Sequence, residues 1–297
     1  MLHWIRKNIK KNIFFRKMIG YHLASSGLFD AYFKNYELSE FWQKRVLDVL
    51  SSPDLHEIST VPNAGQISGG KQIMHNGLRI HIGSYYGPEY ARMLIQSKGI
   101  HEPQEERVFQ EVLKTLPPNS TMIELGAFWS FYSMWFQQKI KGAKNYMIEP
   151  DAFNLGHGRR NFKLNGFNGD FTQAFVGKES KSGQPQTICI DDFAAAKKID
   201  FIDMLHCDIQ GYEYEMLQGA IRTFQSNKIG YVFISTHNKS VHDQCTQFLI
   251  DKSFTIIAAA DMQETYSEDG FIGAKAPGYD GLQSLHISKK KGLDTNL

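Results

Sequence analysis

The segment from Thr121 to Asp151 constrains the fold more than any other part of the chain. It reads as a buried strand (TMIEL), a small-residue turn, a helix, and a second strand that ends on an acid (NYMIEPD). Gly126 and Ala127 allow a sharp turn, and Glu149 closes the second strand. In a doubly wound sheet this acid lies beside the first turn, where it can accept hydrogen bonds from ribose hydroxyls. The pattern predicts a nucleoside-binding unit; the alternative is an ordinary βαβ unit with chance acids.

The turn itself discriminates between nucleosides. Dinucleotide folds use G-x-G-x-x-G, because three glycines allow a tight turn and close approach to a pyrophosphate. Here only Gly126 remains, Phe128 and Trp129 would crowd a pyrophosphate, and Ser130 stands where a further small residue would be. S-adenosylmethionine has no phosphate, and its sulfonium favours a nearby carboxylate such as Glu124. The turn therefore predicts S-adenosylmethionine as the cofactor.

Strand and helix patterns alternate along the rest of the chain, which predicts an α/β fold with a mostly parallel sheet. We expect a helical extension over 1–60, a connecting region with a hairpin over 61–100, and the main domain over 101–297. The expected elements are a hairpin over 75–82, helices over 103–116 and 152–164, and strands over 171–176, 202–208, 231–236, 255–260 and 282–288. The polar stretch 261–281 is then either a lid over the site or an ordinary mobile loop.

Composition excludes several classes of protein. The formal net charge is +2 and charges of both signs are mixed, so no nucleic-acid partner is expected. Cys189, Cys207 and Cys245 fit no metal or redox spacing, which indicates reduced thiols in a cytoplasmic protein. Within residues 1–20, six basic residues interleave with apolar ones. This pattern predicts a basic amphipathic helix, either in peripheral contact with an anionic membrane surface or packed on the domain or a partner subunit.

A second group of polar residues lies over 202–220 (IDMLHCDIQGYEYEMLQGA). Side chains alternate along a strand, so His206 and Asp208 share one face. They also stand at its carboxyl end, where open α/β sheets bind ligands. The next strand ends at His237, which we expect to face the same crevice as Asp208 if the two strands are neighbours.

Several ordered motifs resemble one family. ELGA, IEPD followed by RRNFKLNG, TICIDDF and MLHCDIQGYEYEMLQGA occur in the order found in FkbM-type S-adenosylmethionine-dependent methyltransferases. The resemblance covers about residues 100–240. It implies the Rossmann-like class I methyltransferase fold, with a seven-stranded sheet and helices on both faces, and methylation of hydroxyl groups on sugars or other small-molecule or glycan acceptors.

The resemblance also implies roles for individual residues. Together with the turn pattern, it gives the expected cofactor-binding set as Glu124, Gly126, Ala127, Phe128, Ser130, Glu149, Pro150, Asp151, Gln173, Ala174 and Asp208. The sequence departs from the family in three places. The family turn GANxG reads GAFWS, Lys-x-Asp-x-Glu-Gly becomes His206, Asp208, Gln210 and Gly211, and Ser235 stands where a glutamate is common. These departures leave the identity of the catalytic base open.

Methyl transfer to a hydroxyl needs alignment and a base. His206, His237 and Asp208 are the candidate catalytic residues, with a histidine favoured as base and Asp208 orienting it or the substrate. The same three residues are possible ligands of a divalent metal, which we do not favour. Tyr85, Tyr86, Tyr90, Phe128 and Trp129 offer flat faces to a glycan or belong to the core. The alternatives are a non-catalytic binding or scaffold protein and, less favoured, a nucleotide-dependent oxidoreductase.

Overall fold

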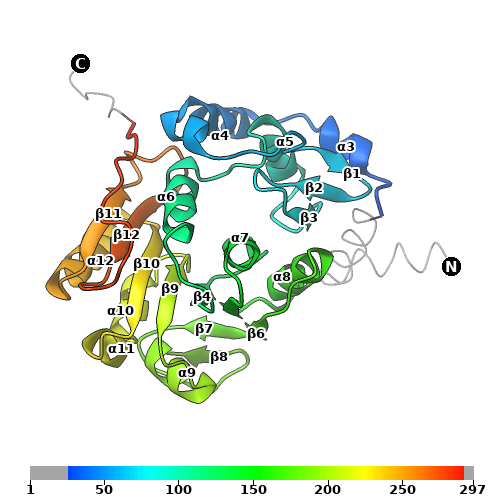
Figure 1. The fold of residues 1–297 in the computed structure, drawn as a ribbon. Coiled ribbons are helices and arrows are strands. Elements are labelled where there is room, and N and C mark those ends of the chain that lie inside the picture. Colours follow the sequence, from blue (N-terminus) through cyan, green and yellow to red (C-terminus); the bar gives the residue numbers. More distant parts are fainter. Residues whose placement is uncertain (1–25, 291–297) are drawn as a thin grey trace.

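The structure, a computed structural model, describes residues 26–290, and its centre is a seven-stranded sheet in the order β11-β12-β10-β9-β4-β5-β6 (Figure 1). Its strands are β4 (Thr121–Leu125), β5 (Lys144–Ile148), β6 (Asp170–Thr172), β9 (Ile202–Cys207), β10 (Ile229–Thr236), β11 (Thr255–Ala260) and β12 (Gly270–Lys275). Parallel pairing joins β6, β5, β4, β9 and β10, while β12 runs antiparallel to both β10 and β11. This is the predicted Rossmann-like class I methyltransferase fold.

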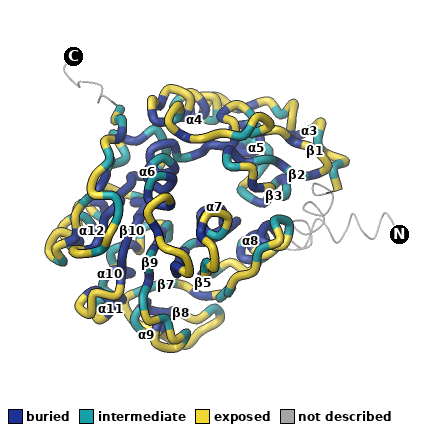
Figure 2. Tube along the Cα trace, in the orientation of Figure 1, coloured by how far each residue is buried: buried dark blue, intermediate teal, exposed yellow. Residues whose placement is uncertain are grey.

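Helices cover both faces of the sheet because the central strands carry apolar side chains on both sides. One face packs against α6 (Pro103–Leu113) and α7 (Phe131–Lys139), and the other against α9 (Ile190–Lys197), α10 (Glu213–Gln218), α11 (Ile221–Gln225) and α12 (Lys239–Asp251). The strands β4, β10 and β12 are buried throughout, whereas the outer sides of the helices are exposed (Figure 2). Alternation places Glu124 and His206, which are register partners on β4 and β9, on the side of α6 and α7.

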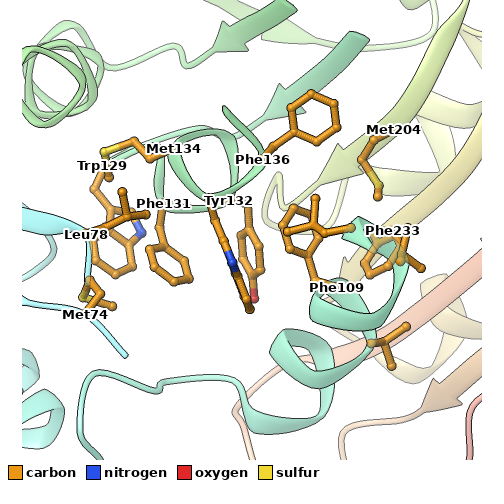
Figure 3. Packing of buried hydrophobic residues seen from close by; sticks show 14 of the residues in the cluster. Met74, Leu78, Phe109, Trp129, Phe131, Tyr132, Met134, Phe136, Met204 and Phe233 are labelled. Carbon is orange, nitrogen blue, oxygen red and sulfur yellow. The ribbon is translucent and has the colours of Figure 1, made fainter. Parts of the chain in front are cut away.

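The core on that side is aromatic. Phe109 of α6 lies against Tyr132 and Trp135 of α7, with ring centroids 5.0 and 5.3 Å apart, and Phe233 of β10 continues the cluster (Figure 3). These rings hold α6 against the sheet and fix the position of acids in its first turn.

The N-terminal part forms a cap beside α7 and α8 (Figure 1). It contains α3 (Asp30–Lys34), α4 (Glu40–Ser51), the 3-10 helix η1 (Pro53–Glu57), α5 (Pro88–Gln96) and an antiparallel sheet of β1 (Ile67–Ser68), β2 (Lys71–Ile73) and β3 (Arg79–His81). The sheet docks on α8 (Ala152–Leu164) through side-chain amides. Asn161 Oδ1 accepts the N–H of His81 at 3.0 Å, and Asn165 Oδ1 accepts that of Arg79 at 2.9 Å.

Several expected elements match the structure closely. The helix over 152–164 and the strand over 255–260 have the predicted bounds, and the 75–82 hairpin exists but begins earlier, at β2. The strand expected over 171–176 is split, because β7 (Ala174–Val176) leaves the main sheet to pair with β8 (Gln186–Ile188). No helix among residues 26–290 is long and apolar enough to cross a membrane. The predicted basic amphipathic helix lies in residues 1–25, outside the described part.

The strand expected over 282–288 is wrong, and the last strand is β12 instead. The sequence of β12 is GFIGAK, and its two glycines are more typical of a loop than of a strand. Gly273 is small for a packing reason, since a Cβ there would lie 3.2 Å from the side chain of Ile257. The segment 282–288 packs beside α6 and β11, with the N–H of Leu285 donating to the carbonyl of Ile257 and Gln104 donating to that of Ser288. The lid expected over 261–281 is therefore also wrong, because β12 lies inside it.

Candidate functional site

A cavity of about 860 Å³ opens at the carboxyl ends of β4, β5 and β9. Its lining includes the turn after β4, the segments that follow β5 and β9, and residues 82–87 of the N-terminal cap. Its volume lies within the range of roughly 300–1,000 Å³ that small-molecule sites occupy. The cap therefore closes over the sheet edge at which α/β proteins bind ligands.

The turn after β4 is held tightly against the neighbouring strands. The N–H groups of Gly126 and Ala127 both donate to the carbonyl of Ile148, at 2.9 and 3.0 Å. Gly126 has φ +73°, and a Cβ added there would lie 1.7 Å from the carbonyl oxygen of Asp208. Only glycine fits this position, because the backbones after β4 and β9 nearly touch.

Glu149 lies at the tip of β5, as the sequence predicts. Its carboxylate accepts the N–H of Phe128 at 3.2 Å and that of Asp151 at 2.9 Å. Burial raises the pKa of Glu149. A carboxylate held in this way has a defined orientation and faces the cavity, which suits a role in binding ribose hydroxyls.

The structure brings most, but not all, of the predicted cofactor residues to the cavity. The lining residues among them are Glu124, Gly126, Ala127, Phe128, Glu149, Pro150 and Asp208. Ser130 is buried at the start of α7, Asp151 caps α8 by accepting from Phe153 and Asn154, and Ala174 is buried in β7. Gln173 donates to the carbonyl of Pro150, and neighbouring Phe175 and Val176 take the place at the cavity that Gln173 and Ala174 were expected to hold.

Aromatic rings form one wall of the cavity. Tyr85 stacks on Trp129 with centroids 4.2 Å apart and an interplanar angle of 12°, and Phe128 meets Tyr85 edge-on at 5.2 Å. Tyr86 is 59 % exposed and also lines the cavity, whereas Tyr90 is buried beneath it. The cap and the β4 turn thus build this wall together.

His206 lies on the cavity floor and is held by an acid from α6. Its Nε2 is 2.7 Å from Glu105 Oε1, and Ser235 donates to the other oxygen of Glu105 at 3.0 Å. His206 Nδ1 has no hydrogen-bond partner among the described residues. Burial alone would lower the pKa of His206, but the hydrogen bond and charge of Glu105, with the charge of Glu124, raise it.

His237 belongs to a separate cluster. Its Nε2 lies 3.2 Å from Asp208, as the shared crevice predicts, and its Nδ1 lies 2.9 Å from the buried Glu213. Burial alone would lower the pKa of His237, but hydrogen bonds with Asp208 and Glu213, and the charge of Asp269, raise it to about 10. His237 is therefore a cation at neutral pH, which disfavours it as a base. Asp208 contacts His237, and no hydrogen bond joins it to His206.

The raised pKa of His237 makes stability depend on pH. Because the folded-state value lies above the ordinary value near 6.5, the stabilisation is complete below about pH 6.5 and is lost as pH rises towards 10. We expect the free energy of unfolding, measured with urea, to fall by on the order of 2–4 kcal/mol across this window. His237→Gln should flatten this dependence, and substitution of the exposed His56 by Gln should not; equal slopes in both variants would contradict the assignment.

Sequence reasoning missed the acids of α6. Glu102, Glu105 and Glu106 precede or begin this helix, where acids are usually explained by the helix dipole. Glu102 lines the cavity and accepts the hydroxyl hydrogen of Tyr132 at 2.7 Å, and burial raises its pKa to about 7. Burial likewise raises the pKa of Glu124 to about 7. No local signal distinguishes Glu105, since its partners His206 and Ser235 are remote in sequence.

The possible metal ligands do not converge. His206 bonds to Glu105, while His237 and Asp208 bond to each other. Within residues 26–290, no group of three or more His, Cys, Asp or Glu side chains is arranged to hold a metal ion. The three cysteines are free and buried, as expected.

One family model matches part of the chain. A family model described as the methyltransferase FkbM domain matches residues 165–256, which confirms the predicted resemblance to FkbM-type methyltransferases. The match covers less than half of the chain, and together with the fold it supports an S-adenosylmethionine-dependent methyltransferase. None of the curated proteins matches the chain.

Solved structures show weak similarity. A precorrin-6y C5,15-methyltransferase from Geobacter metallireducens is 16 % identical with a TM-score of 0.42, covering 57 % of this chain and 86 % of its own. TrmK of M. capricolum, in complex with S-adenosylhomocysteine, is 15 % identical with a TM-score of 0.39, covering 61 % and 71 %. A methyltransferase from Aquifex aeolicus is 11 % identical with a TM-score of 0.39, covering 58 % and 89 %. Similarity at this level says nothing about the substrate.

Proposed function

We propose that this protein is an O-methyltransferase that transfers the methyl group of S-adenosylmethionine to a hydroxyl of a sugar, glycan or glycolipid precursor. The observation that carries the proposal is a single cavity lined both by the edge that fits a nucleoside and by the histidine of a buried histidine–carboxylate pair. Gly126 and Glu149 form the edge, and His206 with Glu105 forms the pair.

The nucleoside-binding edge fits the cofactor. Glu149 would hold the ribose hydroxyls, and the backbone at Gly126 and Ala127 would adjoin the methionine part, with Glu124 near the positive charge. Bound there, S-adenosylmethionine supplies an electrophilic methyl group on sulfur. The residues of the turn need only align it with the acceptor oxygen, because in-line alignment provides much of the acceleration.

The proposed base is His206. Its Nε2 carries the hydrogen that it donates to Glu105, which leaves the lone pair on Nδ1, the atom without a partner. Nδ1 would accept the proton of the acceptor hydroxyl, which would make its oxygen nucleophilic towards the methyl group that the cofactor supplies. Glu105 and Glu124 stabilise the imidazolium that results. Glu105 is thus a positioning residue for this step.

The acceptor would lie against the aromatic wall. Tyr85, Tyr86 and Phe128 present ring faces and edges to the cavity, and Glu102 offers a buried carboxyl group that can bind hydroxyls. Sugars combine apolar ring faces with several hydroxyl groups, so this mixture favours a carbohydrate acceptor.

Calorimetric titration with S-adenosylmethionine, S-adenosylhomocysteine and NAD tests the cofactor. We expect both sulfur nucleosides to bind and NAD not to bind. Sugar nucleotides and glycan precursors would then be screened with S-adenosylmethionine, and mass spectrometry would locate the added methyl on oxygen. No binding of either sulfur nucleoside would refute the proposal. Binding without methylation of any hydroxyl acceptor would favour the scaffold alternative.

A further inference from the structure

A second cavity of about 580 Å³ lies between the ends of α6 and α7 and the loops around residues 59–61 and 75–76. It shares no lining residue with the first cavity. Its volume is again within the range of small-molecule sites. None of the proposed steps of methyl transfer uses it.

Two hydrogen-bond donors on the lining residues have no acceptor. Trp135 is 2 % exposed, and its indole Nε1 has no partner among the described residues. The amide Nδ2 of Asn76 is likewise buried and without a partner. Buried donors are nearly always satisfied, by protein, water or ligand, so an acceptor that enters this cavity can supply the partner that the chain does not.

The charge of the lining residues also favours a ligand with acceptor atoms. Lys114, Lys139 and Lys141 line the cavity, and no aspartate or glutamate does. Lys114 donates to Glu111 at 2.6 Å, and no ion pair with a carboxylate within the described residues involves Lys139 or Lys141. Val61, Leu113, Leu116 and Ile140 add an apolar part to the lining, beside polar residues that include His75 and Gln110.

We propose that this second cavity binds a small organic anion with an apolar body. The acidic group of the ligand meets the ammonium groups of Lys139 and Lys141. The apolar body packs against Leu113 and the ring of Trp135, and an acceptor atom takes the indole N–H. This site does not depend on the proposed methyl acceptor or on His206.

The probe for the test is 8-anilinonaphthalene-1-sulfonate, an aromatic anion of suitable size. Calorimetry should show binding at one site per chain, with the same affinity in the presence and absence of S-adenosylhomocysteine. The double variant Lys139→Ala/Lys141→Ala should bind at least about tenfold more weakly, since each lysine contributes a charge. Trp135→Phe should also weaken binding, because it removes the orphan donor while keeping an aromatic ring.

Two controls separate this site from non-specific binding. Lys178→Ala/Lys181→Ala removes two exposed lysines that do not line the cavity and should leave the affinity unchanged. N-phenyl-1-naphthylamine, which has the same rings without the sulfonate, should bind at least about tenfold more weakly. Circular dichroism establishes that each variant is folded. Absence of probe binding, displacement by S-adenosylhomocysteine, or equal affinities in the two lysine variants would overturn the proposal.

Discussion

Gly126→Ala is expected to abolish binding of S-adenosylhomocysteine and to lower the free energy of unfolding by about 4 kcal/mol or more. The added Cβ would lie 1.7 Å from the carbonyl oxygen of Asp208, so the backbones after β4 and β9 must move apart. That movement displaces the turn that adjoins the proposed cofactor site. Urea unfolding and calorimetry measure the two effects.

Gly166→Ala is the matched control for this prediction. Gly166 has nearly the same φ, +74°, but a Cβ there meets nothing within 4 Å. Gly166→Ala should therefore lower the free energy of unfolding only by the cost of the left-handed backbone conformation, about 1–2 kcal/mol, and should leave cofactor binding intact. If Gly126→Ala loses no more stability than Gly166→Ala, the close approach of the two backbones is not what requires glycine.

His206→Gln is expected to lower the rate of methyl transfer by about 10²–10⁴-fold while leaving S-adenosylhomocysteine binding within a few-fold of the original. The substitution removes the base but keeps a polar side chain of similar size. kcat with the acceptor identified by screening, and calorimetry with S-adenosylhomocysteine, provide the two measurements. His237→Gln is the comparison, and it should lose less than about tenfold, because His237 is already protonated. The reverse order of effects would reject His206 as the base.

The role of Glu105 is tested by the pH profile. His206 acts only when neutral, so the rate should rise with pH through its raised pKa. Glu105→Gln removes the hydrogen-bonded carboxylate that raises this pKa, and the rising limb should move to lower pH. A reduction in kcat without movement of the limb would mean that Glu105 is only structural.

Much of the fold follows from local patterns. The apolar run of β4, the glycine turn and the acid at the end of β5 each depend on a few consecutive residues, as does the helix over 152–164, which Asp151 caps. The strand at 270–275 was not predictable in this way. Its glycines are explained by side chains of β11 and α12 that pack against it, and those contacts exist only in the folded chain.

The candidate site likewise combines features that local sequence patterns predict with contacts that exist only in the folded chain. Sequence alone determined the position of the proposed nucleoside-binding edge, because strand alternation and the single-glycine turn place Glu124, Gly126 and Glu149 at the ends of neighbouring parallel strands. The sequence also placed His237 beside Asp208, but only the tertiary structure decided the partner of His206. Glu105 lies 101 residues before His206 in the chain, and packing of α6 across the sheet brings them together. Hydrogen bonds over such separations depend on how helices pack, which no local sequence pattern records.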